Sequence, residues 1–451
     1  MRSFWFFCCT SLCGSLLWAQ SQAPIPSRPD PKEIPLPVIH TSMAAMPGPD
    51  QLPTRVEMPG VMQLNNGQTV KTLAQWRQRR AQMRTILEYY AVGQAPPAPG
   101  NVKGKVLLSQ RVKNGTVLYR LVHLSFGPQQ SLGFDIGVFT PLSGGKVPTV
   151  IAPFGAPPGA KPLPLLSQGG NQGKGEDVLL LTGPAKPVAT LSSRPEKSAE
   201  EIAATNPAIA HGYAFVTFDN NDCGEDTTLR LADGSWAYRT TRFFPAYPNY
   251  DWGLLRAWAW GVSRIVDYLE TDPHIDHAKL IVTGFSRTGK SALIAGAYDD
   301  RIAMTAPVAS SGGGTPAYRF SGAGRGGHEG LSEVIRKYPN WFSPHLHEFW
   351  GQSDKLPFDE HWFIALVAPR PLLSLEGTRD PNLCHNGIYQ SFQAATPAYA
   401  FFQKEDRLGI HWTDRQHAIV DGDWQAMLAF ADHYLLGKPT TEKFDQFPRK
   451  D

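Results

Sequence analysis

One stretch of this sequence, residues 280–293, constrains the fold more than any other. It reads Leu-Ile-Val-Thr-Gly-Phe-Ser-Arg-Thr-Gly-Lys-Ser-Ala-Leu. An apolar, β-branched run is followed by a turn in which glycines flank Ser286, and then by a segment of small residues that suits a helix. This order predicts a strand–turn–helix elbow that holds Ser286 above a sheet as a nucleophile. These residues alone leave open a second interpretation, an ordinary glycine-rich turn with Ser286 as a helix N-cap.

The rest of the chain alternates strand and helix patterns, which predicts an α/β fold with a mostly parallel central sheet between two helical layers. The first three expected strands are separated by short turns and form an antiparallel portion of the sheet. Helices are expected at 72–90, 251–270, after Ser286 and at 424–435. Strands are expected at 105–109, 116–125, 132–140, 147–154, 213–218, 280–283, 302–308, 371–375 and, as the last strand, 398–402.

The N-terminal residues predict export, and the residues after 59 are expected to form a single catalytic domain. Residues 1–19 combine a basic start, a short apolar run and a small residue at the end, which is typical of a secretory signal peptide. Residues 20–59 are rich in proline and are expected to form a linker or surface strap, and 60–451 form one domain. After the signal is removed only Cys223 and Cys384 remain, as either a disulfide or two free thiols.

Composition excludes several classes of function. The chain has 43 basic and 40 acidic residues, so it lacks the clustered basic excess of a nucleic-acid-binding protein. No segment after the signal approaches the roughly 20 apolar residues of a membrane-spanning helix. No Cys/His cluster has the spacing of a metal site, and the acidic run 219–222 fits a polar turn better than a calcium loop. We therefore infer no structural zinc. We also expect a monomer.

A base and an acid follow Ser286 in the order that α/β-hydrolases use. Asp380 comes just after an expected strand, 94 positions beyond Ser286, and His417 lies 37 positions further on. Histidine would take the proton of the serine hydroxyl, and the carboxylate would orient the ring and stabilise its charged form. Glu376 remains a rival for the acid and His411 a rival for the base.

Two cations adjoin the expected nucleophile. Arg287 follows it directly, where a positive charge opposes the dipole of a helix N-terminus, so a functional reason is expected. Its guanidinium would act as a donor to the developing oxyanion. Lys290 shares its helix face three positions later. The pair predicts a cationic rim suited to an acidic or polyhydroxylated substrate.

The run 284–290 resembles the G-x-S-R-x-G-K signature of the glucuronoyl esterases, carbohydrate esterase family 15. The resemblance extends over about 63–435 and is strongest after 250, where several further stretches resemble bacterial members. These stretches are 258–261, 267–273, 298–303, 339–342, 356–361 and 365–371.

The resemblance implies a serine esterase that cleaves esters between glucuronic or 4-O-methylglucuronic acid on xylan and lignin alcohols, without a cofactor. It implies that Ser286 is the nucleophile, His417 the base and Arg287 the oxyanion donor. It also implies that Lys290 and Glu329 contact the sugar.

Two positions depart from the family pattern. Many members carry the catalytic acid where this chain has Ser310, whereas Asp380 matches the alternative position used by some bacterial members. Many members also carry a substrate-stacking tryptophan where this chain has Asn382. The missing tryptophan keeps open an esterase for other acyl groups, such as acetyl on xylan. The missing acid keeps open a catalytically silent carbohydrate-binding protein.

Overall fold

The computed structural model describes residues 39–444, apart from 143, 162, 167–196, 228, 230, 232–234 and 323–328. The predicted signal peptide at 1–19 and the first half of the predicted strap at 20–59 lie outside the described residues. Within the described ranges no helix is long and apolar enough to span a bilayer.

Nine strands of the described chain form one sheet in the order β1-β2-β3-β5-β4-β6-β7-β8-β9. The first three pair antiparallel, β3 pairs antiparallel with β5, and all later neighbours are parallel. The predicted mixed sheet is therefore confirmed. Their bounds are β1 Lys103–Val112, β2 Val117–Phe126, β3 Leu132–Pro141, β4 Val147–Ala152, β5 Ala214–Phe218, β6 Ile275–Phe285, β7 Met304–Val308, β8 Leu372–Gly377 and β9 Leu408–Thr413.

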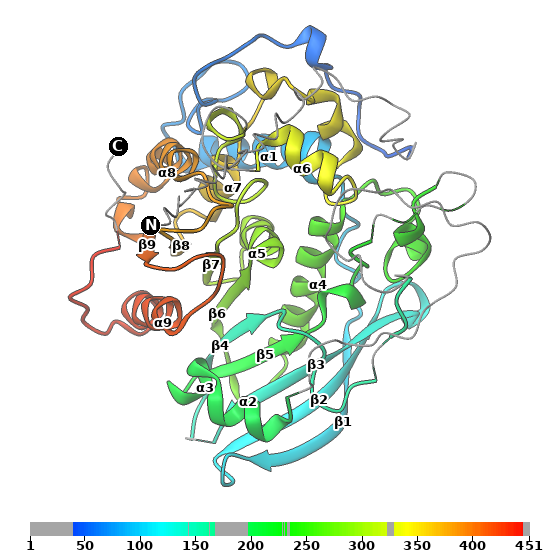
Figure 1. The fold of residues 1–451 in the computed structure, drawn as a ribbon, viewed down its shortest axis with the longest axis vertical. Helices are drawn as coiled ribbons and strands as arrows, with labels where there is room; N and C mark the ends of the chain where they lie inside the picture. The colour runs from blue at the N-terminus through cyan, green and yellow to red at the C-terminus, as the bar shows by residue number, and fades with distance from the viewer. Residues whose placement is uncertain are drawn as a thin grey trace, which may run out of the picture.

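Helices cover both faces of this sheet and make three layers (Figure 1). Every residue of β4, β5, β7 and β8 is buried, as expected for parallel strands enclosed on both sides. Neighbouring strand residues face opposite layers, so Ile281 packs in one apolar cluster and Val282 in the other. One cluster contains residues of α1 Leu73–Leu87, α4 Leu254–Leu269, α5 Arg287–Tyr298, α6 Leu331–Lys337, α7 His361–Val367 and α8 His385–Ala400; the other contains residues of α2 Ala199–Thr205, α3 Pro207–Ala210 and α9 Asp421–Leu436.

The expected last strand at 398–402 is wrong. Residues up to Ala400 complete helix α8, and the last strand is β9. The helical assignment follows from burial, because Ile388, Phe392, Ala395 and Tyr399 recur every three or four positions and point into the core. As a consequence His411 lies within β9, paired with Leu375 of β8, and not in the loop beyond the last strand.

The described part of the predicted strap packs against helix α7. The carbonyl oxygen of Pro59 accepts a hydrogen bond from the Trp362 indole at 3.0 Å and lies 2.7 Å from the Nε2 of His361. Cys223 and Cys384 are both buried and form no disulfide with each other, so of the two alternatives left open by the sequence the structure favours two thiols.

Candidate active site

Ser286 occupies the tight turn between β6 and α5. Its backbone has φ 56° and ψ −120°, an unfavourable conformation for a residue with a side chain. Its N–H donates to the carbonyl of Val308 at 2.9 Å, which fixes the turn against the neighbouring strand β7. The serine at the tip of this turn therefore projects its side chain at the carboxyl edge of the sheet.

The two glycines of the motif allow this close packing of helix on strand. A Cβ on Gly284 would lie 2.4 Å from the carbonyl oxygen of Thr288. A Cβ on Gly289 would lie 2.9 Å from the carbonyl oxygens of both Gly284 and Val308. Both distances are shorter than van der Waals contact allows, so the spacing of glycines around Ser286 follows from the geometry of the elbow.

Ser286, His417 and Asp380 form a continuous hydrogen-bonded chain. His417 Nε2 lies 2.9 Å from the Oγ of Ser286, and His417 Nδ1 lies 2.7 Å from Oδ2 of Asp380. The three residues follow β6, β9 and β8, whose carboxyl ends meet at one edge because these strands are parallel. The arrangement can transfer a proton from the serine hydroxyl to the imidazole while a carboxylate holds the ring.

The loops that carry the acid and the base are joined to each other. The N–H of Thr378 donates to the carbonyl of Thr413, and the N–H of Arg379 donates to the carbonyl of Arg415. Arg415 is in turn paired with the buried Asp423 of α9. These contacts extend the pairing of β8 with β9 into the loops and fix the separation between the acid and the base.

Asp380 is set up to remain ionised. Burial alone would raise the pKa of this carboxyl group, but its hydrogen bonds to His417 and to the N–H of Asn382 lower the pKa below its ordinary value, with a smaller contribution from the charge of Arg415. An ionised acid on Nδ1 keeps the ring proton there and leaves Nε2 free to accept from Ser286.

The rival acid, Glu376, belongs to a different buried chain. Its Oε1 accepts from Ser374 Oγ at 2.5 Å and from Thr315 Oγ1 at 3.0 Å. Thr315 Oγ1 lies 3.0 Å from the Oγ of Ser310, one of the two positions at which the sequence departs from the pattern it resembles. Both ring nitrogens of His417 already have partners, so the acid position beside the base is filled by Asp380.

Burial raises the pKa of Glu376 to about 7, which predicts a pH-dependent stability. The folded state then holds a proton between pH 4.5 and 7 that the unfolded chain releases, so the free energy of unfolding falls as pH rises through this range. We expect this group to contribute a loss of about 3 kcal/mol, from roughly 1.4 kcal/mol per pKa unit. Urea unfolding at pH 5 and pH 8 should show a smaller loss in Glu376→Gln than in wild type.

The matched control is Glu405→Gln, which removes an exposed glutamate carboxyl group from a short helical turn. Its stability should follow the wild-type pH dependence. Identical pH slopes for wild type and Glu376→Gln would contradict a raised pKa at Glu376.

Arg287 is paired with Asp226, a residue that the sequence did not single out. Its Nη1 contacts Oδ2 of Asp226, and the guanidinium carbon lies 5.5 Å and 5.8 Å from the ring centres of Trp341 and Tyr338. Burial alone would lower the pKa of Arg287, but the Asp226 carboxylate raises it above its ordinary value. The side chain is therefore charged, and 34% of its surface remains exposed.

Lys290 is buried beneath the site, with 1% of its side chain exposed. Its Nζ donates to the carbonyl of Ser310 at 2.5 Å and lies 3.4 Å from Oε2 of Glu329. Burial lowers the pKa of Lys290, and the Glu329 carboxylate opposes that shift. Lys290 and Glu329 are brought together, but the predicted cationic rim is wrong, because each cation has its own carboxylate.

Sequence reasoning missed Asp226 and the aromatic pair Tyr338 and Trp341. The two rings stack at 3.8 Å, with an angle of 4° between their planes. Asp226 comes four positions after the acidic run 219–222, where Asp219 accepts from the N–H of Asn221 at 2.9 Å and forms the expected polar turn. Among the described residues no group of three or more His, Cys, Asp or Glu side chains is arranged to hold a metal ion.

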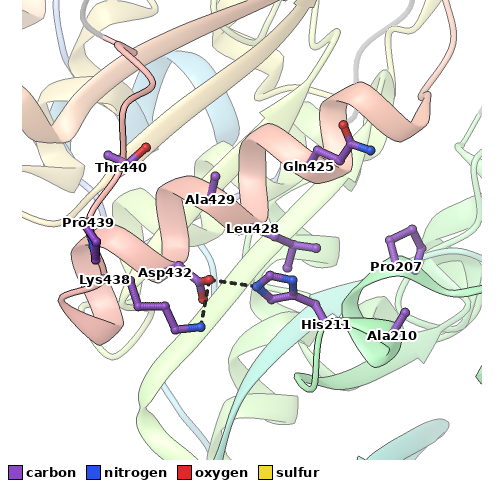
Figure 2. A pocket seen from close by; sticks show the side chains of 10 residues that line it. All are labelled: Pro207, Ala210, His211, Gln425, Leu428, Ala429, Asp432, Lys438, Pro439 and Thr440. Carbon is purple, nitrogen blue, oxygen red and sulfur yellow. Dashed lines mark hydrogen bonds and ion pairs between the residues drawn. The ribbon is translucent and has the colours of Figure 1, made fainter.

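A hollow of about 520 Å³ lies elsewhere on the molecule, where α9 meets α3 and the segment 438–440 (Figure 2). Three of its polar side chains pair with one another: Asp432 lies 2.9 Å from both the Nε2 of His211 and the Nζ of Lys438. The predicted site residues do not line it, so we assign the chemistry to the edge of the sheet that carries Ser286.

Comparison with known sequences gives a consistent set of relatives. A family model described as glucuronyl esterase of fungi matches residues 192–403. The 4-O-methyl-glucuronoyl methylesterase of Phanerochaete carnosa is 30% identical over 392 residues, which are 85% of this chain and 82% of the relative. A carbohydrate esterase from an unknown prokaryotic organism is 27% identical and aligns with 84% of this chain and 90% of its own length.

Solved structures agree with these relatives. A promiscuous esterase of carbohydrate esterase family 15 from a marine bacterial metagenome superposes with a TM-score of 0.66 at 26% identity, covering 86% of this chain and 98% of the other. A glucuronoyl esterase of the same family from Caldicellulosiruptor kristjansonii superposes with a TM-score of 0.63 at 28% identity, covering 88% and 94%. The predicted α/β-hydrolase fold is confirmed by these likenesses.

Proposed function

Because this chain belongs to the glucuronoyl esterases of carbohydrate esterase family 15, and is thus a carboxylic ester hydrolase, we propose that it hydrolyses esters of glucuronic or 4-O-methylglucuronic acid through Ser286, His417 and Asp380. The observation that carries this proposal is the contact between the nucleophile and its base, 2.9 Å from Oγ of Ser286 to Nε2 of His417. The 4-O-methyl-glucuronoyl methylesterase activity named for the fungal relative supports the choice of acyl group.

The reaction proceeds in two steps. Oγ of Ser286 attacks the ester carbonyl as Nε2 of His417 takes its proton, and the ring then returns this proton to the departing alcohol. The product of the first step is an ester between Ser286 and the uronic acid. Water, activated by the same imidazole, attacks this ester, and the proton passes from the ring to Ser286 as the free acid leaves.

The negative charge on the carbonyl oxygen would develop beside the N-terminus of α5. Backbone N–H groups at this helix end and the guanidinium of Arg287 are the donors that we assign to it. Glu329, fixed by Lys290, is the group that we assign to the sugar hydroxyls. Because Lys290 is 1% exposed, its proposed role is to hold Glu329 and the Ser310 carbonyl rather than to bind sugar from solvent.

The natural substrate that we propose is an ester linking glucuronoxylan to lignin, cleaved outside the cell during degradation of plant cell walls. The apolar N-terminal run at 1–19 supports export as a secreted or periplasmic protein. We further propose that 60–451 is one catalytic domain that works as a monomer.

A second candidate activity, removal of other acyl groups such as acetyl from xylan, is favoured by Asn382. This position lacks the aromatic ring on which many family members stack the substrate, which weakens selection for the uronic acid. One structural neighbour is itself described as promiscuous, which is consistent with a broader range of esters.

Rates on three substrates separate these functions. We expect wild-type enzyme to hydrolyse benzyl glucuronate and methyl glucuronate with kcat/KM at least about 10²-fold above that for an acetylated xylose, because a site built for the polar groups of one substrate discriminates strongly against others. Release of acetate without release of glucuronic acid would contradict the proposed substrate. If none of the three substrates is hydrolysed, the result would favour the catalytically silent carbohydrate-binding protein.

A further inference from the structure

Asp226 joins two parts of the site that are far apart in sequence. It lies in the loop after β5, 61 positions before Arg287 and 115 before Trp341. One carboxylate oxygen contacts the guanidinium of Arg287, and the other accepts a hydrogen bond from the indole N–H of Trp341 at 2.8 Å. The carboxylate side chain is 13% exposed, so it is largely shielded from water where it meets Arg287.

The aromatic pair limits where the guanidinium can lie. The rings of Trp341 and Tyr338 stack with their centres 3.8 Å apart and their planes nearly parallel, and the guanidinium carbon is 5.5 Å and 5.8 Å from these centres. A point almost equidistant from two parallel rings lies beside their common edge, not over either outer face. Arg287 is thus confined by a carboxylate and by a ring edge, although its side chain is long and flexible.

The position of the cation matters for the transition state. A donor aimed in advance at the developing oxyanion is more effective than one that must be ordered during the reaction. Asp226 uses one guanidinium nitrogen and leaves the others available, because arginine has five N–H donors in a fixed fork. Loss of the Asp226 charge would free Arg287 to adopt many rotamers.

The charge of the pair matters for product release. The product acid is a carboxylate near neutral pH, and an unpaired guanidinium binds a carboxylate strongly through two parallel hydrogen bonds. With Asp226 in place the pair has no net charge, so the anionic product meets less attraction. The neutral ester substrate does not depend on this compensation.

We propose that Asp226 is a positioning residue that fixes Arg287 for the oxyanion and, by compensating its charge, weakens binding of the glucuronate product. This proposal rests on the proposed function, because it takes Arg287 as an oxyanion donor and uronic acid as the product. The substitution Asp226→Asn tests it with little change of shape, since the amide oxygen can still accept from Trp341.

The experiment is a double-mutant cycle on benzyl glucuronate. We expect Arg287→Ala to lower kcat by about 10²–10³-fold, as removal of other oxyanion donors does. Asp226→Asn should lower kcat by about tenfold with KM little changed, and the double variant should be no slower than Arg287→Ala alone. Free glucuronate should inhibit Asp226→Asn about tenfold more tightly than wild type, and this tightening should vanish in the double variant.

The outcomes distinguish this proposal from the proposed function. If Arg287→Ala has the kcat of wild type, Arg287 is not an oxyanion donor, and the role proposed for Asp226 is overturned as well. If Arg287→Ala is slow but Asp226→Asn has the kcat and the glucuronate inhibition of wild type, only the role of Asp226 is overturned. The role of Asp226 is also overturned if the fold-losses of kcat in the two single variants multiply in the double variant, because Asp226 would then act through a residue other than Arg287.

The matched control is Asp276→Asn, which breaks an ion pair with Lys279 in the first half of β6, away from Ser286. It removes one carboxylate charge, as Asp226→Asn does, and should leave both kcat and glucuronate inhibition at wild-type values. Thermal unfolding of each variant establishes that a loss of rate does not reflect a loss of folded protein.

Discussion

Ser286→Ala is expected to lower kcat on benzyl glucuronate by about 10⁴–10⁶-fold, the largest effect of any single substitution in this chain. Without the hydroxyl group no ester can form with the enzyme, and the remaining oxyanion donors give only weak catalysis of direct attack by water. The substitution should not unfold the protein, because alanine adopts the backbone at φ 56° with strain similar to that of serine. Release of benzyl alcohol measures the rate.

The control for this prediction is Ser291→Ala, which removes a buried hydroxyl five positions further along α5. It should keep kcat within about twofold of wild type, since it deletes the same kind of hydroxyl group from the helix that follows Ser286, away from the base. Substantial activity in Ser286→Ala would show that another group is the nucleophile.

The second large effect is expected for Asp380→Asn, which should lower kcat by about 10⁴-fold, as it does in serine protease triads. The amide can donate to the ring, so the ring proton moves to Nε2 and that atom can no longer accept from Ser286. The charge that stabilises the imidazolium is also lost. The amide oxygen can still accept from the N–H of Asn382, so the loop should keep its shape.

Glu376→Gln is the matched comparison, because Glu376 is the other carboxyl group at the end of β8. It should keep kcat within about threefold of wild type at pH 7, since Glu376 contacts Ser374 and Thr315 rather than the base. Normal activity in Asp380→Asn combined with a large loss in Glu376→Gln would reverse the assignment of the acid.

Much of the fold could be predicted because burial on both faces leaves a strong pattern. The strands β4, β5, β7 and β8 and the second half of β6 are largely apolar runs, and α4 buries Trp258, Val262, Ile265 and Leu269 at helical spacing. The prediction at 398–402, where α8 ends, was wrong because the aromatic residues of this segment also suit a strand. Only its packing through Phe392, Ala395 and Tyr399 decides between the two.

The order of Ser286, Asp380 and His417 could be predicted because parallel strands bring their carboxyl ends to one edge. The carboxylates that pair with the two cations could not be predicted. Asp226 and Glu329 reach Arg287 and Lys290 from loops 61 and 39 positions away, and no spacing rule relates a loop to a helix face. The sequence therefore predicts a cationic rim where the structure has two ion pairs.

The central proposal, that Ser286 forms an ester with glucuronic acid, is tested most directly by rapid-quench mass spectrometry. Wild-type enzyme is mixed with benzyl glucuronate, quenched in acid within the first turnover and digested. We expect the mass of one glucuronoyl group on the peptide that contains Ser286, and its absence in Ser286→Ala treated in the same way. A glucuronoyl group on any other residue, or steady hydrolysis of the ester by Ser286→Ala, would contradict the proposed mechanism.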